Sequence, residues 1–311
     1  MPVRGAGWAR LLVLAVLGAG GASLAGFVDG GWWLLELCRP FQMQYLGVLG
    51  LCLIGLVGLR RWAWAALAGV LLLAPGSRMV PYYRGGNEPA GGMIPFRVLS
   101  FNVLSRNQRR AEVVDWVRET DPDLAFFPEV TPEWAAALEK LRATMPYQVL
   151  EPREGNFGFA LFSKHPFLAE REVPSGLLDV ATVRVELDIG GRKVVLIGAH
   201  PLPPLSGAMA RDRDQVLLEL ADEVRQEPGP VVLAGDLNAT PWCHAMKPVY
   251  AAGLRDSRWG RGVRATWRWR NPFFAIPIDH VLIKGAVAVE NCQTGPDLGS
   301  DHRPVVVDLR L

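Results

Sequence analysis

The chain has 311 residues, half of them hydrophobic, and its 33 basic side chains nearly balance its 31 acidic ones. This length allows one large domain with an appendage. The four cysteines form no Cys-x-x-Cys pair, which argues against a zinc site. Residues 1–84 hold seven basic and two acidic side chains, and the remainder holds 26 and 29. The net charge of that remainder, −3, disfavours non-specific nucleic-acid binding, which depends on excess Lys and Arg.

Three apolar segments within residues 1–84 predict a membrane anchor of about three transmembrane helices. Segments 9–28 and 41–59 are long enough to cross the hydrocarbon core of a bilayer as helices. Segment 62–74 is shorter and spans only if its helix continues through Pro75. A signal peptide is the alternative for the first segment, and a buried or re-entrant helix is the alternative for the third.

The distribution of arginines predicts how this anchor is oriented. Arg4 and Arg10 flank the first segment, and the pair Arg60–Arg61 lies between the second and third. Arginines are enriched in cytoplasmic loops, so both groups are placed in the cytoplasm. Two arginines after the third segment count against this orientation. We expect a multi-pass protein of the cell membrane whose C-terminal domain lies outside the cytoplasm.

Gly and Pro residues in 85–93 predict a flexible linker. Residues 94–311 then alternate strand-like and helix-like segments, some of them arranged as hairpins. This mixture favours an α/β domain with mixed or antiparallel sheets over a regular parallel barrel. The predicted strands are 96–101, 124–130, 147–151, 158–162, 182–187, 193–199, 231–237, 278–283 and 303–311, and the predicted helices are 108–120 and 208–226.

Polar clusters lie at the ends of predicted strands of this domain. Taken singly, each has an ordinary structural explanation: Asn102 could cap a turn, Glu129 could precede a helix, and Asp236 with Asn238 could form an Asx turn. Because the ends of neighbouring strands converge in space, we expect these side chains to form one site. The clusters are Asn102; Glu129; His200; Asp236 with Asn238; Asp279; and Asp301 with His302.

These residue types suit phosphoryl transfer to water. A carboxylate such as Glu129 can hold Mg²⁺, which keeps waters and the substrate phosphate as further ligands. Neutral donors such as Asn102 and Asn238 can stabilise charge on phosphate oxygens, and either Asp236 or His302 can take a proton from water. The sequence contains no Gly-x-Ser-x-Gly elbow and no Walker loop, which excludes the hydrolases and nucleotide-binding proteins built on those motifs.

The motifs around these residues resemble those of the endonuclease/exonuclease/phosphatase superfamily, in the same order, from Phe96 to Leu311. The resemblance implies a four-layer sandwich, in which two mixed β-sheets lie face to face with helices outside. The combination of GDLN with SDHRP is the most specific part of it. The motifs are SFNV (100–103), FPEV (127–130), GAHP (198–201), GDLN (235–238), IDHV (278–281) and SDHRP (300–304).

The resemblance also implies a metal site. It places Mg²⁺, with Mn²⁺ as the alternative, on Glu129 with Asn102 nearby. It assigns Asp236 to orienting or deprotonating the attacking water. One position departs from the pattern: some nuclease members carry an acidic or amide residue two positions after the asparagine, and this chain has Leu104 there.

The remaining roles follow from the same resemblance. Asn238 and His200 would bind the substrate phosphate. Asp301 would orient His302, its neighbour in the sequence. Asp279 would support the site from the adjacent strand.

The apolar segments before this domain make the whole chain similar to a bacterial membrane-bound branch that includes the teicoplanin-resistance membrane proteins. That branch is thought to act on lipid-linked pyrophosphate outside the cell membrane. We therefore expect a membrane-anchored, metal-dependent phosphohydrolase that acts at the lipid bilayer on a phosphorylated lipid such as a polyprenyl pyrophosphate. No protein partner is indicated.

Two alternatives are a membrane-tethered DNA or RNA nuclease and a binding protein that has lost catalysis. The presence of every candidate catalytic residue argues against the binding protein. Arginines and tryptophans interleave between residues 255 and 270. Such a stretch could bind single-stranded nucleic acid, lie on anionic head groups, or form an ordinary solvated loop.

Overall fold

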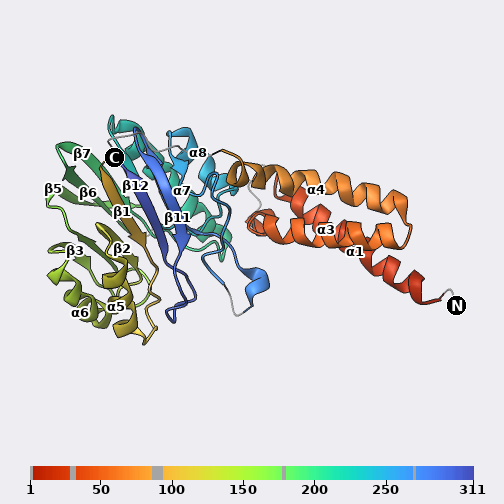
Figure 1. Cartoon of the computed structure of the whole chain (residues 1–311), viewed down its shortest axis with the longest axis horizontal. Coiled ribbons are helices and arrows are strands. Elements are labelled where there is room, and N and C mark those ends of the chain that lie inside the picture. Colours follow the sequence, from red (N-terminus) through yellow and green to blue (C-terminus); the bar gives the residue numbers. More distant parts are fainter. Residues whose placement is uncertain (1–2, 29–32, 86–93, 177–179, 269–270) are drawn as a thin grey trace. The chain divides into compact units, whose positions relative to one another are not determined.

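The computed structural model describes residues 3–28, 33–85, 94–176, 180–268 and 271–311. The predicted linker beyond Gly85 lies outside these residues, as do Trp269 and Arg270 of the arginine-rich stretch. The chain divides into two compact units, which are described separately (Figure 1). One unit comprises residues 1–84 and 242–244, and the other comprises residues 85–241 and 245–311.

The smaller unit is a bundle of apolar helices. Its long helices pack along one another through small and branched side chains, among them Val16, Leu49 and Ala68, each fully buried. Their outward faces carry large apolar side chains such as Leu51 and Leu73, each 71% exposed. A helix that is apolar on all sides is typical of a membrane or a large core. The helices are α1 (Val3–Ala25), α2 (Trp33–Glu36), α3 (Gln42–Gly58) and α4 (Trp62–Tyr83).

Among the described residues, two helical stretches are long and apolar enough to cross a membrane, Gly7–Ala25 and Trp62–Tyr83. The helix that begins at Trp62 continues through the buried Pro75, which the predicted third span required. Helix α3 is apolar but has 17 residues, a rise of about 26 Å. Signal sequences and core helices of soluble proteins can be equally apolar, so these helices are weak evidence for an anchor.

Within its described residues, the larger unit contains two six-stranded sheets, ordered β11–β12–β1–β2–β4–β3 and β5–β6–β7–β8–β10–β9. Strands β1 and β2 run parallel, as do β7 and β8, and the other pairings are antiparallel. The α/β class with two mixed sheets is therefore confirmed. The strands are β1 (Pro95–Ser100), β2 (Leu124–Pro128), β3 (Tyr147–Glu151), β4 (Phe159–Ser163), β5 (Phe167–Ser175), β6 (Val180–Ile189), β7 (Arg192–Gly198), β8 (Val231–Asp236), β9 (Arg255–Asp256), β10 (Asp279–Lys284), β11 (Ala288–Thr294) and β12 (Val305–Arg310).

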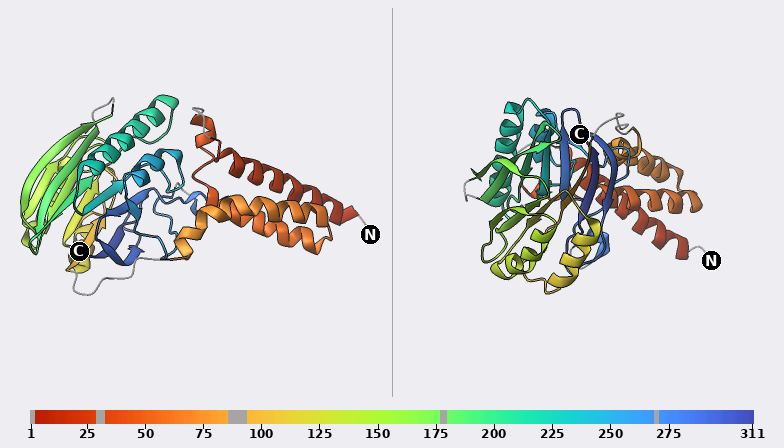
Figure 2. Two further views of the ribbon diagram at one scale, coloured as in Figure 1. Left: turned by 90° about the horizontal axis from the view of Figure 1, so that it is seen from above. Right: turned by 60° about the vertical axis from the view of Figure 1, so that its left-hand side comes forward.

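The two sheets bury a common core between them, and helices cover their outer faces (Figure 2). Alternation along β2 shows how this arises: Phe126 belongs to the core between the sheets, and its neighbours Ala125 and Phe127 pack outward with α5 (Arg110–Thr120) and α6 (Pro132–Leu138). Helix α7 (Gly207–Gln226) lies over the second sheet and is capped by Ser206, whose Oγ accepts from Met209 N at 3.2 Å. The shorter α8 comprises Lys247–Ala251.

Candidate active site

The candidate residues of both sheets meet at the strand ends. Asn102 follows β1, Glu129 follows β2, His200 follows β7, and Asp236 ends β8. Asp279 begins β10, which runs antiparallel to β8, so that it pairs directly with Asp236. All five side chains are buried, with at most 7% exposed. The parallel pairs β1–β2 and β7–β8 explain the convergence, because parallel strands end at the same edge of a sheet.

The carboxylate of Asp236 is the centre of this cluster. Its Oδ2 lies 3.5 Å from His200 Nε2 and 3.6 Å from His302 Nε2, and it accepts from Asn102 Nδ2 at 3.2 Å. Its Oδ1 accepts the backbone N–H of Asn238 at 3.0 Å. Burial favours the neutral carboxyl, but His302 and His200 outweigh it and lower the pKa of Asp236 to about 2. Asp236 is therefore ionised at neutral pH.

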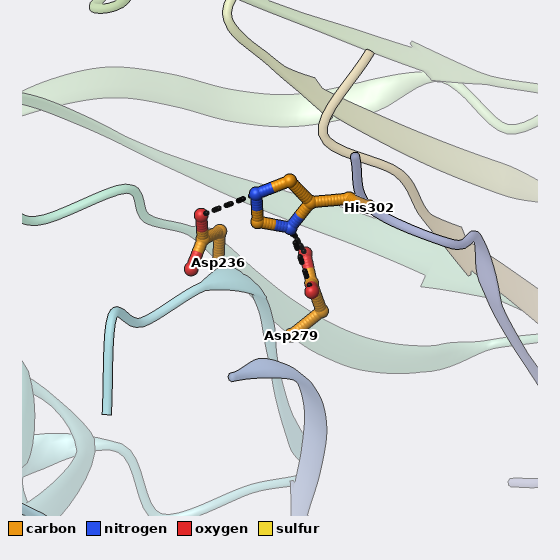
Figure 3. Close-up of side chains that lie close together, drawn as sticks. All are labelled: Asp236, Asp279 and His302. Atoms are coloured by element: carbon orange, nitrogen blue, oxygen red, sulfur yellow. Dashed lines mark hydrogen bonds and ion pairs between the residues drawn. The ribbon is translucent and has the colours of Figure 1, made fainter. Parts of the chain in front are cut away.

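The imidazole of His302 lies between two carboxylates (Figure 3). Its Nδ1 contacts the Asp279 oxygens at 2.9 and 3.1 Å, and its Nε2 faces Asp236. Burial alone would lower the pKa of His302, but Asp279 and Asp236 more than offset it and raise the value to about 10. Burial raises the pKa of Asp279 from its usual range, although His302 opposes this. We infer a protonated imidazole held between two aspartates.

The structure corrects the expected role of Asp301. Asp301 Oδ2 accepts from Trp267 Nε1 at 3.2 Å, and its backbone oxygen accepts from Arg268 N at 3.0 Å. Among the described residues no hydrogen bond joins the Asp301 carboxylate to the His302 ring, although its charge contributes to the raised pKa of His302. Asp279 orients His302 instead.

A model of the Endonuclease/Exonuclease/phosphatase family matches residues 99–302, more than half of the chain. The chain belongs to this family. It is therefore a metal-dependent phosphoric ester hydrolase, the class of enzyme to which the family's members belong. The motifs that suggested the superfamily from the sequence thus identify it correctly.

Curated relatives of this family member come from bacteria. The chain is 28% identical over 251 residues to a UPF0294 protein of Klebsiella pneumoniae, covering 76% of this chain and 91% of that protein. It is 29% identical over 126 residues to a UPF0294 protein of Vibrio cholerae, covering 39% of this chain and 41% of the relative. The match to the Vibrio protein thus spans less than half of that protein's length.

Solved structures of the family share the fold. An endonuclease/exonuclease/phosphatase from Beutenbergia cavernae has a TM-score of 0.59 at 23% identity, covering 70% of this chain and 72% of that one. The humanized TDP2 of D. rerio has a TM-score of 0.59 at 18% identity, covering 70% of this chain and 99% of the TDP2 chain. The human Nocturnin catalytic domain with bound sulfate has a TM-score of 0.57 at 17% identity, covering 69% of this chain and 94% of the Nocturnin chain.

The site of this hydrolase suits a divalent cation that prefers oxygen ligands. Glu129, in the left-handed conformation with φ +64°, accepts from Asn102 Nδ2 at 3.0 Å and from Ser105 N at 3.2 Å. The same Asn102 nitrogen also donates to Asp236 at 3.2 Å, so two carboxylates converge on one amide group. A cation neutralises such a pair, and carboxylate oxygens suit Mg²⁺ or Mn²⁺.

Asn102 lies beside Glu129, as expected, and its ligation of a metal stays a prediction. Its Oδ1 accepts the Leu104 N–H at 3.0 Å, which fixes the orientation of the amide and directs its nitrogen toward Glu129. Asn102 therefore acts as a hydrogen-bond donor between the carboxylates. Glu129 and the Asn102 oxygen, which has a second lone pair, remain the residues predicted to hold the metal.

Asp236, Asp279 and His302 form a second group whose polar atoms lie close enough to hold a metal. His302 Nδ1 is engaged by Asp279 and its Nε2 faces Asp236, an arrangement in which a carboxylate commonly orients a metal-binding histidine. The ring would have to be neutral to ligate a metal. The group is a hydrogen-bonded triad that is also a candidate metal site.

The two expected phosphate-binding residues lie on either side of Asp236. His200 packs against the Phe157 ring at 6.0 Å, and within the described residues its buried Nδ1 has no hydrogen-bond partner. Asn238 donates from Nδ2 to the Pro201 oxygen at 2.9 Å. An amide nitrogen carries two hydrogens, so a second one is left for a ligand.

Three supporting residues were not predicted from the sequence. Thr266 Oγ1 accepts the Asp279 N–H at 3.0 Å, and Ser300 Oγ joins the Asn102 carbonyl to the His302 N–H at 2.8 and 3.0 Å. Gly235 has φ +145°, and a Cβ there would lie 1.9 Å from the backbone oxygen of Ala199, the residue directly after β7. Ser300 and Gly235 stand inside the recognised motifs, whereas Thr266 carries no sequence signal.

Proposed function

We propose that this hydrolase cleaves the phosphate ester or pyrophosphate of a membrane lipid, with a polyprenyl pyrophosphate as the first candidate. In this proposal α1, α3 and α4 anchor the chain in the cell membrane, and the catalytic domain lies on the extracytoplasmic side. The observation that supports it is the presence of a phosphoryl-transfer site and an apolar helical unit on one chain. Tethering an enzyme at a bilayer raises its effective concentration toward lipid substrates.

The site residues suggest how the reaction proceeds. A divalent cation held by Glu129 would neutralise charge on the substrate phosphate. Asp236, ionised and with a pKa of about 2, is a weak base, so it first orients the attacking water and accepts its proton only as the water oxygen bonds to phosphorus. The protonated His302, kept in place by Asp279, donates to a phosphate oxygen.

A nuclease is less well supported because, among the described residues of the arginine-rich stretch, several arginines are engaged within the protein. Arg258 is buried and forms two hydrogen bonds to Asp256, at 2.8 and 2.9 Å. Arg261 donates to backbone carbonyls, and Arg268 pairs with Asp297. Nucleic-acid affinity depends on cations that can neutralise phosphates, and these arginines are committed to other partners.

A side-by-side assay of the purified full-length protein in detergent with Mg²⁺ tests the proposal. Phosphate release from a polyprenyl pyrophosphate and nicking of a plasmid are measured together, with Asp236→Ala and His302→Ala as inactive variants. Asp222→Ala, at an exposed aspartate of α7, is the matched control. Release from the lipid alone, lost in both site variants but not in the control, supports the proposal. Plasmid nicking with the lipid untouched would establish a tethered nuclease instead.

The orientation has its own test. Alkaline phosphatase fused to the C-terminus in bacterial cells should be active, and green fluorescent protein fused at the same point should be dark. The opposite pattern would place the catalytic domain in the cytoplasm and exclude a substrate confined to the outer leaflet.

A further inference from the structure

The last residue of β8, Asp236, and Asn238 in the turn that follows are two of the candidate residues. Asn238 has a left-handed backbone with φ +48°, a conformation that Asn tolerates better than most residues. Its side-chain nitrogen is tied to the Pro201 oxygen at 2.9 Å. The backbone conformation of this turn and the hydrogen bond to Pro201 together set the direction in which the Asn238 side chain points.

Two buried side chains hold that backbone by its consecutive carbonyl groups. Arg213, on α7, donates from Nη1 to the Asn238 oxygen at 3.1 Å. His280, on β10, contacts the Ala239 oxygen through Nε2 at 2.8 Å. Arg213 is 1% exposed and His280 is fully buried. The turn is thus fixed from a helix on one side and from a strand on the other.

The surroundings of His280 determine which of its nitrogens carries the proton. Arg258 Nη2 lies 2.7 Å from His280 Nδ1, and a guanidinium can only donate. Nδ1 is therefore the acceptor, so Nε2 carries the hydrogen and donates to the Ala239 carbonyl. Arg258 is itself fixed by the fully buried Asp256 carboxylate. A buried ion pair thereby sets the tautomer of a neutral histidine.

We propose that Arg213 and His280 are positioning residues of the hydrolase. By holding the carbonyls of Asn238 and Ala239 they place the Asn238 amide, and with it the Asp236 carboxylate to which the Asn238 N–H is bonded. This inference rests on the proposed role of Asn238 and Asp236 in the site. It does not depend on whether the substrate is a lipid.

Paired substitutions in the full-length protein test the proposal. His280→Leu and Arg213→Met remove the donors, whereas His280→Gln and Arg213→Lys keep one. Arg184→Met is the matched control, because Arg184 is another buried arginine but pairs with Glu186 and Glu227. The probe is bis(4-nitrophenyl) phosphate with Mn²⁺, which avoids any assumption about lipids.

We expect kcat/KM to fall roughly 10- to 100-fold in the donorless variants, as for other supporting residues of catalytic sites, and to recover in His280→Gln and Arg213→Lys. Arg184→Met should lower Tm and leave kcat/KM near the wild-type value. If the donorless variants keep wild-type kcat/KM, or if Arg184→Met loses as much activity as they do, the proposal is overturned. Should His280→Leu fail to fold, Arg213→Met decides alone.

A double-mutant cycle separates positioning from general destabilisation. If His280 acts through Asn238, then His280→Leu should cost much less activity in an Asn238→Ala background than in the wild type. Equal losses in the two backgrounds would show that His280 does not act through Asn238.

Hydrogen–deuterium exchange provides a readout that needs no substrate. The peptide covering residues 236–240 should exchange faster in His280→Leu than in wild type, and at the wild-type rate in His280→Gln. Unchanged exchange in His280→Leu would remove the basis of the proposal. If the wild-type protein cleaves no phosphate compound, the assigned chemistry fails, and exchange still decides whether these two donors hold the turn.

Discussion

Asp279 Oδ2 and His302 Nδ1 lie 2.9 Å apart, although the two residues are 23 positions apart in the sequence. Both side chains are almost fully buried. Replacing Asp279 by Asn keeps the shape but removes the charge that supports the protonated ring. We expect Asp279→Asn to lower kcat roughly 100-fold, within the range for disrupted acid–base groups. Steady-state kinetics on bis(4-nitrophenyl) phosphate would measure this.

The same variant should change the pH profile. The pKa of His302 is raised to about 10, so the ring stays protonated from acidic pH through neutrality and loses its proton only as pH approaches that value. Without the Asp279 charge the pKa falls, and the alkaline loss of activity should begin at lower pH. An alkaline limb at the same pH in both proteins would show that His302 protonation does not control the rate.

Asp301→Asn should have a much smaller effect than Asp279→Asn. Asp301 contacts Trp267 and the Arg268 backbone but not the His302 ring, so catalysis should fall by less than about threefold, a change of less than about 1 kcal/mol. Both variants replace an aspartate by asparagine, but only Asp279 contacts the His302 ring. Comparable losses in the two variants would restore Asp301 to the role expected from the sequence.

Metal affinity should depend on Glu129. Chelation with EDTA should abolish hydrolysis, and Mg²⁺ or Mn²⁺ should restore it. Glu129→Gln should weaken Mn²⁺ binding by at least roughly 10-fold, because it removes a carboxylate ligand. Calorimetric titration of Mn²⁺ measures the dissociation constant directly. Glu133→Gln is the control. Glu133 lies in α6 and accepts a hydrogen bond from Thr131, which caps that helix, so this variant should bind Mn²⁺ as the wild type does.

Stability should fall in acid partly because of His280. Burial, followed by the charge of Arg258, lowers the pKa of His280 to about 4 from 6.5. Between these values the unfolded chain binds a proton that the folded protein does not, so stability decreases as pH falls through this window. At about pH 5 the loss is on the order of 2 kcal/mol relative to neutral pH. The drop in Tm between neutral pH and pH 5 should be smaller in His280→Gln than in wild type.

Gly235 should not tolerate a side chain. A Cβ at this position would lie 1.9 Å from the Ala199 oxygen, and φ is +145°. We expect Gly235→Ala to destabilise the fold by more than the roughly 1–3 kcal/mol of backbone strain alone. Gly191→Ala is the control, because Gly191 also has a positive φ but a Cβ there would meet no atom within 4 Å. Equal changes in Tm would show that the contact with Ala199 costs nothing.

The motif residues could be placed from the sequence because each follows an apolar run whose end is well marked. Glu129 and Asp236 illustrate this, since both come directly after buried stretches. The partner of His302 could not be found in this way, because adjacency in sequence favours Asp301 and only strand pairing brings Asp279 close. Thr266 was missed because its contact with the Asp279 N–H also arises only from the tertiary fold.

The sequence patterns also did not predict strands β5 and β11 or the full length of helix α4. Strand β5 carries the charged run Glu170–Glu172, which hides its apolar alternation, and β11 has a shift in register between Val289 and Asn291. Helix α4 continues past Pro75, where a break was the ordinary expectation. In each case a tertiary environment outweighs a local preference.

The pairing of β1 with β12 has a consequence for how the domain forms. These are the first and last strands of the catalytic domain, and Pro95 pairs with Arg310. In the sheet, β12 lies between β1 and β11. The first sheet therefore stays incomplete until contacts separated by more than two hundred residues have closed. Such long-range closure slows folding, and the open edge of β1 is exposed to aggregation in the meantime. We expect refolding to be slow and dependent on protein concentration.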